Sequence, residues 1–301
     1  MVRVGVVLLP QERWSSARAR WRRAEQMGFD HAWTYDHLAW RDLADEPWFA
    51  TVPLLAAAAA VTDRIGLGTW VASPNFRHPV PFAKDVMGLD DVSGGRFVLG
   101  VGAGGEGWDA GVLGPAPTRG ERTRRFAEFL GLLDTLLTQP VTEHVGEFYE
   151  AHAARMVPGT LARPRTPFVV AANGPRTMAL AARHGQGWAT YGPGTGVGDG
   201  VDEAAAQEEW WGGLARMVDA FDEVAGGRAV GRWLSLDGAP RFSLTSAALA
   251  VEGVERAAAL GFGDVVLHWP RESGVYAGEE RELERFAAEL PRLQALEPAA
   301  R

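Results

Sequence analysis

The chain contains no cysteine. This absence excludes disulfides, thiolate nucleophiles, iron–sulfur clusters and cysteine-ligated zinc. Lysine is almost as rare, since Lys84 is the only one against 29 arginines, and it falls inside an expected helix instead of at a strand end. Its position argues against the Schiff-base lysine of an aldolase or of a pyridoxal-phosphate enzyme.

Long apolar runs are also missing. No stretch approaches the roughly 20 apolar residues that a membrane-spanning helix needs. The opening segment, MVRVGVVLLP, is too short for the core of a signal peptide and lacks a small-residue cleavage site. Its alternation indicates a first buried strand. We therefore expect a cytoplasmic protein with no membrane contact.

The charge and the absent motifs exclude further classes. The formal net charge is −8 with both signs interspersed, so no broad basic surface exists for nucleic acid. There is no HxH or HExxH pair, and His31 and His37 lie six residues apart without neighbouring ligands, so we expect no metal site. The nucleophile motif GxSxG and the Walker phosphate loop are absent as well.

What the sequence does contain is a regular alternation of short apolar runs and amphipathic stretches. The expected strands are Val4–Leu9, His31–Tyr35, Ile65–Ala72, Phe97–Val101, Phe168–Ala172, Gly187–Tyr191, Trp233–Asp237 and Asp264–His268. The expected helices lie near 15–27, 49–61, 79–90, 119–138, 175–184, 202–225, 245–260 and 279–294. Eight strands, each followed by a helix, predict one (β/α)8 TIM barrel over residues 1–301, with loop insertions at the C-terminal rim. An open doubly wound sheet is the alternative, although no GxGxxG follows the first strand.

Local signals mark the ends of several elements. Ser15 is an expected N-cap, and Gly28 is expected to end the same helix. Thr118 is expected to cap the long helix that stops before Pro140. Residues 142–149 predict a short hairpin inserted before the fifth strand, and residues 192–200 a loop at a strand end.

In a parallel barrel, the functional site is built where the strands end. The most informative region is 64–106, a β-α-β unit with small or polar residues after each strand. The strand ends of the whole chain collect polar and aromatic residues, as a pocket for a flat aromatic cofactor requires. They are Asp36, His37, Trp40, Ser73, Asn75, Arg77, His78, residues 102–106, residues 173–177, His268 and Trp269.

The segment AANGPRT, residues 171–177, has the features of an anion site. Pro175 suits the first turn of a helix, and Gly174 allows close approach to a ligand. The free N–H groups of a helix start, with Arg176 and Thr177 as further donors, would bind a cofactor phosphate. An ordinary strand-to-helix turn is the alternative.

Three further groups of residues allow both a functional and a structural interpretation. His37 could transfer a proton or simply be a satisfied structural histidine. Arg77 and His78 could contact a cofactor or only brace their loop. The glycines at 102, 104, 105 and 107 could admit a flat ring or a tight reversal, and beside them Glu106 or Asp109 could relay a proton.

Three blocks of sequence, in this order, resemble the bacterial luciferase-like flavin and deazaflavin oxidoreductases. They are MGFDHAWTYDHL (27–38), the region 64–106 with its RHP and SGGRFVLGVGAGG, and PFVVAANGPRTMALAARHGQGWAT (167–190). The resemblance implies a (β/α)8 barrel, a homodimer, and a flavin or the deazaflavin coenzyme F420 at the C-terminal rim. It also implies hydride transfer or, with reduced flavin, oxygen activation.

The resemblance also implies roles for particular residues. His37 resembles the histidine near the reactive face of the ring, with Trp40 beside the substrate, and Glu106 resembles a proton-donating glutamate for which Asp109 competes. Trp70 and Val71 match a bulge that backs the ring, often through a cis peptide bond. The full set of expected cofactor contacts is Trp70, Val71, Ser73, Gly102, Ala103, Gly104, Asn173, Gly174, Pro175, Arg176 and Thr177.

The cofactor is the main open choice. TYDHL and SPNFRHP resemble the deazaflavin-dependent branch more closely, so F420 is expected, with FMN as the alternative. With F420 the reaction would be hydride transfer to or from a small organic substrate. With reduced FMN it would be monooxygenation, and a barrel that binds cofactor without catalysis is the third possibility.

Overall fold

The computed structural model describes residues 1–105, 107–194 and 202–301. Its centre is a closed barrel of eight parallel strands in the order β1-β10-β9-β8-β7-β4-β3-β2. The strands are β1 (Arg3–Val7), β2 (His31–Thr34), β3 (Gly66–Thr69), β4 (Phe97–Gly102), β7 (Phe168–Ala171), β8 (Gly187–Thr190), β9 (Gly231–Ser235) and β10 (Asp264–His268). The predicted TIM barrel is confirmed, and the open sheet is excluded.

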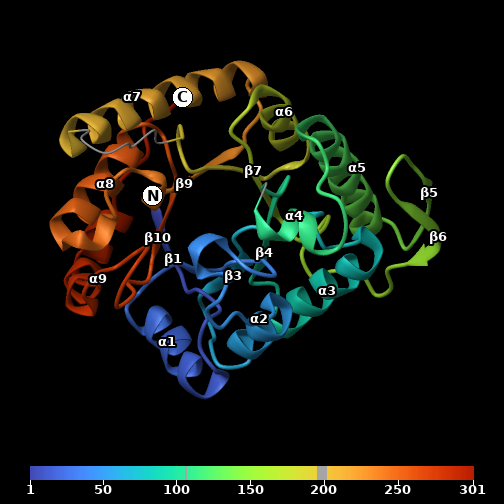
Figure 1. Ribbon diagram of the computed structural model, residues 1–301, viewed down its shortest axis with the longest axis horizontal. Helices are drawn as coiled ribbons and strands as arrows, with labels where there is room; N and C mark the ends of the chain where they lie inside the picture. Colours follow the sequence, from blue (N-terminus) through green and yellow to red (C-terminus); the bar gives the residue numbers. More distant parts are fainter. Residues whose placement is uncertain (106, 195–201) are drawn as a thin grey trace.

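Helices surround this barrel (Figure 1), and eight of those in the described residues are long. They are α1 (Trp14–Gln26), α2 (Thr51–Ala59), α3 (Pro79–Val92), α5 (Arg119–Thr138), α6 (Pro175–His184), α7 (Glu203–Ala225), α8 (Ala247–Ala259) and α9 (Glu280–Gln294). All eight were predicted from the helical periodicity. The sequence did not predict the short helices of the loops, which are η1 (Arg41–Leu43), α4 (Trp108–Val112), η2 (Leu236–Gly238) and η3 (Ser243–Thr245).

The two faces of the strands build two separate cores. On β1, Val4 and Val6 face the surrounding helices, whereas Val7 faces the barrel interior. The interior is filled largely by the indoles of Trp33, Trp70 and Trp233. Alternate faces of the same short strands are therefore both buried, which explains why the strands appear as nearly continuous apolar runs.

Two glycines make room for large interior side chains. A Cβ on Gly5 would lie 1.8 Å from Nδ1 of His31, and a Cβ on Gly68 would lie 2.1 Å from the ring of Trp33. His31 is buried there, where Nδ1 accepts from Trp33 at 2.7 Å and Nε2 lies 3.1 Å from Asp264. Buried partners occupy both ring nitrogens, so His31 is a structural histidine.

Two of the three predicted helix boundaries are confirmed. Thr118 caps α5 in a capping box with Glu121, and Gly28 follows α1 with φ at +91°. The predicted N-cap Ser15 is wrong. The N–H groups of Ser16 and Ala17 already donate to the carbonyl of Arg13 at 2.9 and 3.0 Å, so the helix begins at Trp14 and places Ser15 inside its first turn.

The predicted hairpin is confirmed and is longer than expected. Strands β5 (Val141–Val145) and β6 (Glu150–Arg155) pair antiparallel outside the barrel. Glu128 of α5 holds the turn, because its carboxylate accepts from the N–H groups of Phe148 and Tyr149. The hairpin and α5 together carry the chain from β4 to β7. Of the predicted loop at 192–200, residues 195–200 lie outside the described part of the chain.

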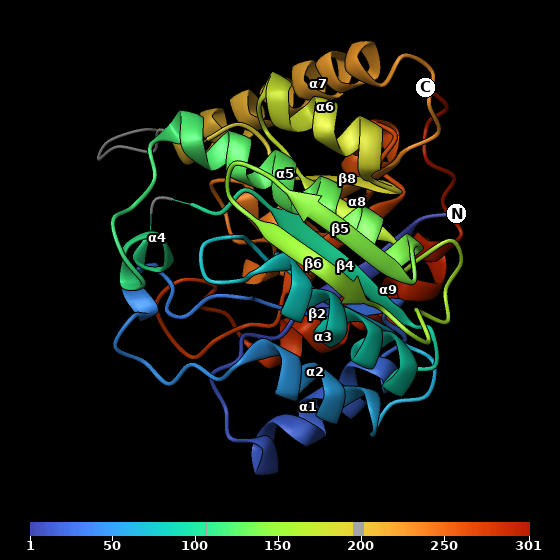
Figure 2. The same ribbon diagram turned by 90° about the vertical axis from the view of Figure 1, so that its right-hand side faces the viewer.

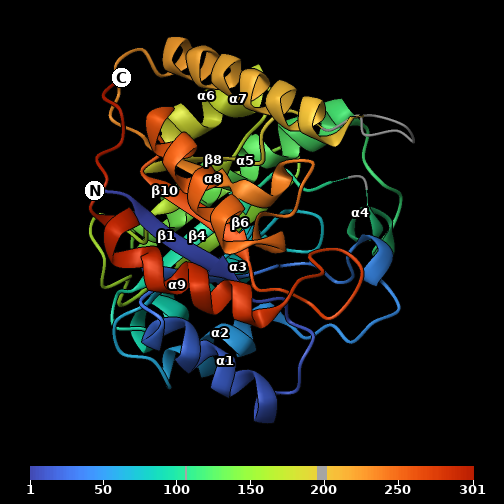
Figure 3. The same ribbon diagram turned by 90° about the vertical axis from the view of Figure 1, so that its left-hand side faces the viewer.

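Both chain termini lie at one end of the barrel, and α4 lies at the other (Figures 2 and 3). Because β1 starts beside the N-terminus, the carboxyl ends of all the parallel strands point toward α4. That end is the rim at which the sequence predicted the site. In the described ranges, every helix is too short or too polar to cross a membrane.

Candidate active site

A histidine–aspartate pair stands at the rim. His37 lies three residues beyond β2, and Asp109 lies in α4. Nδ1 of His37 is 2.5 Å from Oδ2 of Asp109, while Oδ1 of Asp109 accepts from the N–H of Leu38 at 2.8 Å. The side chain of His37 is 22% exposed, whereas that of Asp109 is 5% exposed. A buried carboxylate therefore fixes one ring nitrogen of His37, and the other, Nε2, is left to contact a ligand.

A second ion pair joins the loops after β2 and β3. Asp36 is 1% exposed and accepts from Nε and Nη2 of Arg77, both at 2.6 Å. Such bidentate pairs fix orientation as well as charge. His78 caps α3, since its Nδ1 accepts from the N–H of Val80 at 3.2 Å. These contacts support the bracing interpretation of Arg77 and His78.

Aromatic rings border His37. The ring of Tyr35 lies 5.8 Å from that of His37 and 5.1 Å from that of Trp40. Trp40 is nearly parallel to Tyr276 at 6.1 Å. Trp48 donates from its indole N–H to the carbonyl of His37 at 2.8 Å. The structure thus brings the predicted residues His37 and Trp40 into one aromatic cluster.

The ends of β3 and β4 meet beside this cluster. The peptide bond between Trp70 and Val71 is cis, as the resemblance implies. Trp70 packs on Trp33 with ring centroids 4.9 Å apart. A Cβ on Gly102 would lie 2.8 Å from Cγ2 of Val71, so a larger residue there would displace Val71. Trp70, Val71 and Gly102 therefore form one wall at the barrel mouth.

The loops that follow these strands also contact each other. Ser73 is buried, and its Oγ accepts from the N–H of Asn75 at 3.4 Å. The amide oxygen of Asn75 accepts from Arg125 at 2.7 Å. Gly104 has φ at +78°, and a Cβ there would lie 2.7 Å from the amide of Asn75. Ala103 packs against the outer core. These contacts hold the loops after β3 and β4 together at the rim.

The predicted phosphate segment starts α6. Gly174 is the N-cap and Pro175 the first helical residue. The hydroxyl of Thr177 accepts from the N–H of Gly174 at 3.3 Å and donates to its carbonyl at 3.0 Å. The N–H groups of Arg176 and Thr177 lie in the first turn, where no helical carbonyl can accept from them. This helix start has the donors and the dipole that suit an anion.

Asn173 has a different task from the residues that follow it. Its amide N–H donates to the carbonyl of Gly192 at 2.7 Å, and its amide oxygen accepts from the hydroxyl of Thr190 at 2.8 Å. Both polar ends of the side chain are therefore used to join the loops after β7 and β8. Its contribution to a ligand would be through backbone.

A cleft of about 330 Å³ opens between α5 and α6. Arg176 lines it together with residues of the first half of α5, among them Thr123 and Arg124. Arg124 is paired with Glu147 at 2.9 Å, whereas Arg176 is exposed and pairs with no other side chain in the ranges that the structure describes. An arginine beside an open helix start favours a negatively charged ligand group here.

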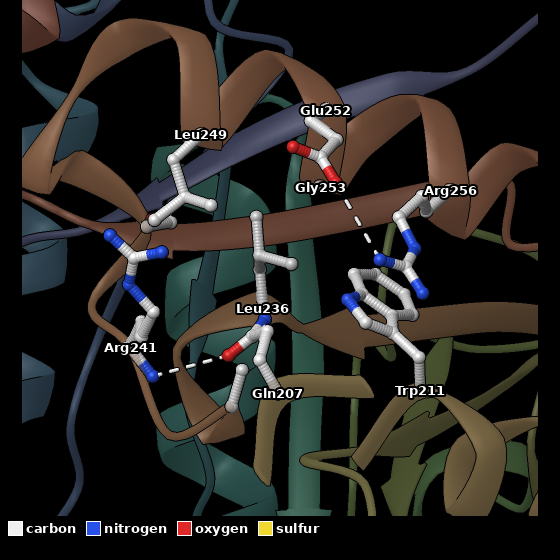
Figure 4. A pocket seen from close by; sticks show the side chains of 10 residues that line it. Gln207, Trp211, Leu236, Arg241, Leu249, Glu252, Gly253 and Arg256 are labelled. Carbon is white, nitrogen blue, oxygen red and sulfur yellow. Dashed lines mark hydrogen bonds and ion pairs between the residues drawn. The ribbon is translucent and has the colours of Figure 1, made fainter. Parts of the chain in front are cut away.

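A second hollow lies between α7 and α8 (Figure 4). Its volume is about 20 Å³, which is room for about one water molecule. Two of the polar groups that line it are paired, since Arg256 binds Glu208 at 2.6 Å and the N–H of Arg241 donates to Gln207 at 3.3 Å. This hollow is too small to be a ligand site.

Sequence reasoning missed one polar cluster at the rim. His268 was recognised as a strand-end residue, but no pattern indicated that it contacts Asp237 and Tyr35. Tyr276 joins this cluster from the loop after β10. Tyr35 and Tyr276 are 241 positions apart, so only the closed barrel brings them together.

The structure does not decide whether Glu106 or Asp109 is the acidic residue expected near the cofactor ring. Both oxygens of Asp109 are engaged by the loop of His37. Glu106 lies outside the described residues. Within the described residues there is also no group of three His, Asp or Glu side chains that could hold a metal ion.

Known proteins are similar to this chain in sequence or in architecture. Residues 1–210 match the family described as luciferase-like monooxygenase. The chain is 32% identical over 327 aligned positions to the F420-dependent glucose-6-phosphate dehydrogenase of Beutenbergia cavernae, which covers 91% of this chain and 92% of that protein. It is 38% identical over 194 positions to the 4-hydroxyprotoasukamycin monooxygenase of Streptomyces nodosus subsp. asukaensis.

The second of these matches is partial. It covers 61% of this chain and 48% of the monooxygenase, so the chain spans about half the length of that relative. Among solved structures, the coenzyme F420-dependent tetrahydromethanopterin reductase of Methanopyrus kandleri has a TM-score of 0.72 over 97% of this chain and 99% of its own. The two chains are only 15% identical, and this likeness concerns the fold alone.

Proposed function

This chain belongs to the luciferase-like monooxygenase family, and from that premise we propose that it transfers a hydride between coenzyme F420 and a small organic substrate. The observation that carries the proposal is the His37–Asp109 pair, held at 2.5 Å at the rim beside an aromatic cluster. An imidazole oriented by a buried carboxylate can hold a directed hydrogen bond to a reacting group.

The residues around this pair suit the two parts of such a cofactor. Trp70, Val71 and the backbone near Gly102 offer a flat apolar wall to a ring system. The start of α6, with Arg176 beside it, offers N–H donors and positive charge to a phosphate. When bound there, the deazaflavin supplies a carbon centre that accepts or donates hydride and reacts poorly with oxygen.

The side chains would then divide the remaining work. Asp109 holds Nδ1 of His37, so that Nε2 faces the ligand and contacts the reacting part of the substrate. Trp40 and Tyr35 pack against this position and exclude water from it. The Asp36–Arg77 pair keeps the loops after β2 and β3 in register, which fixes the wall relative to His37.

Two features favour F420 over FMN. The Beutenbergia cavernae relative, which aligns with 91% of this chain, is described as F420-dependent. The segments 34–38 and 73–79 also resemble the deazaflavin branch. A monooxygenase that uses reduced FMN is the second candidate, supported by the 38% identity to a relative described as a monooxygenase.

Oxygen dependence separates the two candidates. We expect purified protein loaded with F420 to oxidise members of a panel of small organic compounds, alcohols among them, under nitrogen, read as loss of F420 absorbance. The rate should not change in air. Product that forms only with reduced FMN and oxygen, and never with F420, would reverse the assignment.

A further inference from the structure

A chain of four side chains crosses the rim next to His37. Asp237 follows β9, His268 ends β10 and Tyr35 follows β2. Oδ2 of Asp237 is 2.9 Å from Nδ1 of His268, and Nε2 of His268 is 2.7 Å from the hydroxyl of Tyr35. The hydroxyl of Tyr35 is in turn 2.9 Å from that of Tyr276.

The hydrogen bonds of this four-residue network have only one possible direction when His268 is neutral. The carboxylate of Asp237 accepts from the N–H groups of His268 and Ser243 at 2.7 and 2.9 Å, so Nδ1 of His268 must also donate to it. Nε2 is then an acceptor, Tyr35 donates to Nε2, and Tyr276 donates to Tyr35. The oxygen of Tyr276 is left with a lone pair for an outside donor.

A proton added to His268 reverses the direction of these hydrogen bonds. Nε2 then donates to Tyr35, Tyr35 donates to Tyr276, and the O–H of Tyr276 is free to donate outward. The outer end is therefore an acceptor in one charge state and a donor in the other. These are the two functions that the oxygen of an alcohol and that of a carbonyl compound require.

We propose that the hydroxyl of Tyr276 binds the substrate oxygen, that Tyr35 and His268 carry the proton exchanged by an alcohol–carbonyl pair, and that Asp237 holds the imidazole of His268 in place. This inference rests on the proposed function and narrows it to that substrate class. Tyr276 is the catalytic residue of the set, because it contacts the substrate. The other three are positioning residues.

The surroundings of Tyr276 hold its ring beside His268 and Trp40. Its ring stacks on His268 at 3.8 Å on one side and faces Trp40 on the other. The loop that carries it is closed by Arg271, whose guanidinium donates to the carbonyl of Ser273 at 3.0 Å and to Glu46 at 2.6 Å. Glu46 belongs to the same loop after β2 as His37. The loop of Tyr276 is therefore fastened to the loop of His37.

The proposed step balances in atoms and charge. In oxidation, the alcohol carbon releases its hydrogen with two electrons to oxidised F420, and the carbonyl double bond forms. The alcohol O–H proton moves to Tyr276, the proton of Tyr276 moves to Tyr35, and that of Tyr35 moves to Nε2 of His268. The result is an imidazolium beside the carboxylate of Asp237. Reduction of the carbonyl runs the same transfers backward.

The groups that face this hydrogen-bonded network leave His268 as the member that can accept the transferred proton. Burial raises the pKa of Tyr35 well above its usual value and that of Tyr276 to about 12, so both stay protonated near neutrality. Asp237 faces His268 from the end of β9, Arg41 of η1 acts on both tyrosines, and the ring of His37 faces Tyr35 at 5.8 Å. Histidine is the side chain that ordinarily changes charge between pH 5 and 8.

The hydrogen-bond direction can be measured without turnover. We expect ¹⁵N NMR of the full chain, with His268 assigned through His268→Asn, to show Nδ1 protonated and Nε2 unprotonated in the neutral ring. Tyr35→Phe should shift the Nε2 resonance of this ring, whereas Tyr149→Phe should not. Tyr149 is a matched control because it is also a buried tyrosine, and its hydroxyl has no partner within the described ranges. A neutral ring protonated at Nε2 would contradict the proposal.

The kinetic test uses F420 with a series of secondary alcohols from 2-propanol to 1-phenylethanol. We expect kcat/KM for oxidation to rise with pH through one ionisation in the wild type and in Tyr149→Phe. Tyr276→Phe and Tyr35→Phe should lose this rise and about 10²-fold of the rate at its upper plateau. KM should change less than kcat.

The outcomes separate this inference from the proposed function. A pH profile that survives in Tyr276→Phe and disappears in His37→Gln would assign proton transfer to His37 and overturn the inference alone. Protein that binds F420 but oxidises no alcohol and reduces no ketone would also overturn it alone. Failure to bind F420 at all would overturn the proposed function.

Discussion

His37 shows how a single residue acquires a function from its partner. The sequence singles out this residue, because an imidazole directly after a strand end is placed at the rim of a barrel. Its partner Asp109 lies 72 positions away in a five-residue helix without periodicity. Local patterns could therefore suggest His37 and weigh Asp109 only as an acidic neighbour of the cofactor ring.

Truncation of His37 is the first prediction at this scale. We expect His37→Ala to bind F420 as tightly as the wild type and to lose about 10²- to 10⁴-fold in kcat/KM, because only contacts to the reacting group are removed. Fluorescence titration and F420 turnover measure the two effects. His152→Ala, which truncates a 68% exposed histidine on β6, is the control and should change neither. Equal activity of His37→Ala and the wild type would make His37 a structural residue.

Two glycines, one in a barrel strand and one in an outer helix, have opposite packing. A Cβ on Gly68 of β3 would lie 2.1 Å from the ring of Trp33, which has no free space inside the barrel. Gly88 of α3 has nothing within 4 Å of the same position. The same substitution should therefore have opposite effects on stability in these two elements.

We expect Gly68→Ala to lower the free energy of unfolding by about 3 kcal/mol or more, since the indole must move. Gly88→Ala should raise it by about 0.5–1 kcal/mol, because alanine is the better helix former. Urea unfolding of both variants compares them directly. A Gly68→Ala variant as stable as the wild type would show that the interior is packed less tightly than the structure describes.

Asp134 joins three elements on the side of the barrel away from the rim. It lies in α5, binds Nε of Arg165 at 2.5 Å before β7, and lies 3.1 Å from Nδ1 of His184 at the end of α6. Burial opposes its charge, but the hydrogen bonds from His184 and Arg165 prevail and lower its pKa from 3.8 to about 2. The ionised form is thus favoured in the folded state.

This shift predicts an acid dependence of stability. Because the folded pKa is depressed, the stabilisation is complete above about pH 4 and is lost as the pH falls toward 2. Since the carboxylate is 35% exposed, we discount its value to about 1 kcal/mol. Asp134→Asn should remove this part of the pH dependence in unfolding experiments between pH 5 and pH 2. Glu209→Gln, at an exposed carboxylate on α7, should leave it unchanged, and identical acid profiles for Asp134→Asn and the wild type would refute the assignment.

Elements were predictable where a period extends over many residues. The eight strands and eight helices follow from alternating apolar runs and helical stripes. The start of α1 was placed wrongly at Ser15 because serine is a strong capping residue, whereas the backbone there is already helical from Trp14. Short helices such as α4 have too few residues to show a period, so they could not be predicted.

At the scale of the whole molecule, the site exists because the strands close into a barrel. The strand ends of β2, β3, β4, β7 and β10 come from across the chain and meet only because the barrel closes. The sequence could predict which residues follow strands, and therefore most of the rim. It could not predict which of them touch, because Tyr35 and His268 are 233 positions apart. The side-chain roles at the rim stay proposals.

The family resemblance also predicts an assembly. We expect a homodimer in solution, with a mass twice the 32.4 kDa of one chain. Light scattering after size exclusion at several concentrations measures this mass. A monomer at all concentrations would contradict this prediction and leave the proposed chemistry unaffected.

The central claim is that this barrel is built for a deazaflavin. Equilibrium titration by cofactor fluorescence, with F420 and FMN in parallel, tests it most directly. We expect micromolar affinity for F420 and at least about 10-fold weaker binding of FMN, a difference of about 1.4 kcal/mol. Arg176→Ser should weaken F420 binding, because the phosphate end loses a positive charge. Tighter binding of FMN, or binding of neither cofactor, would contradict the claim.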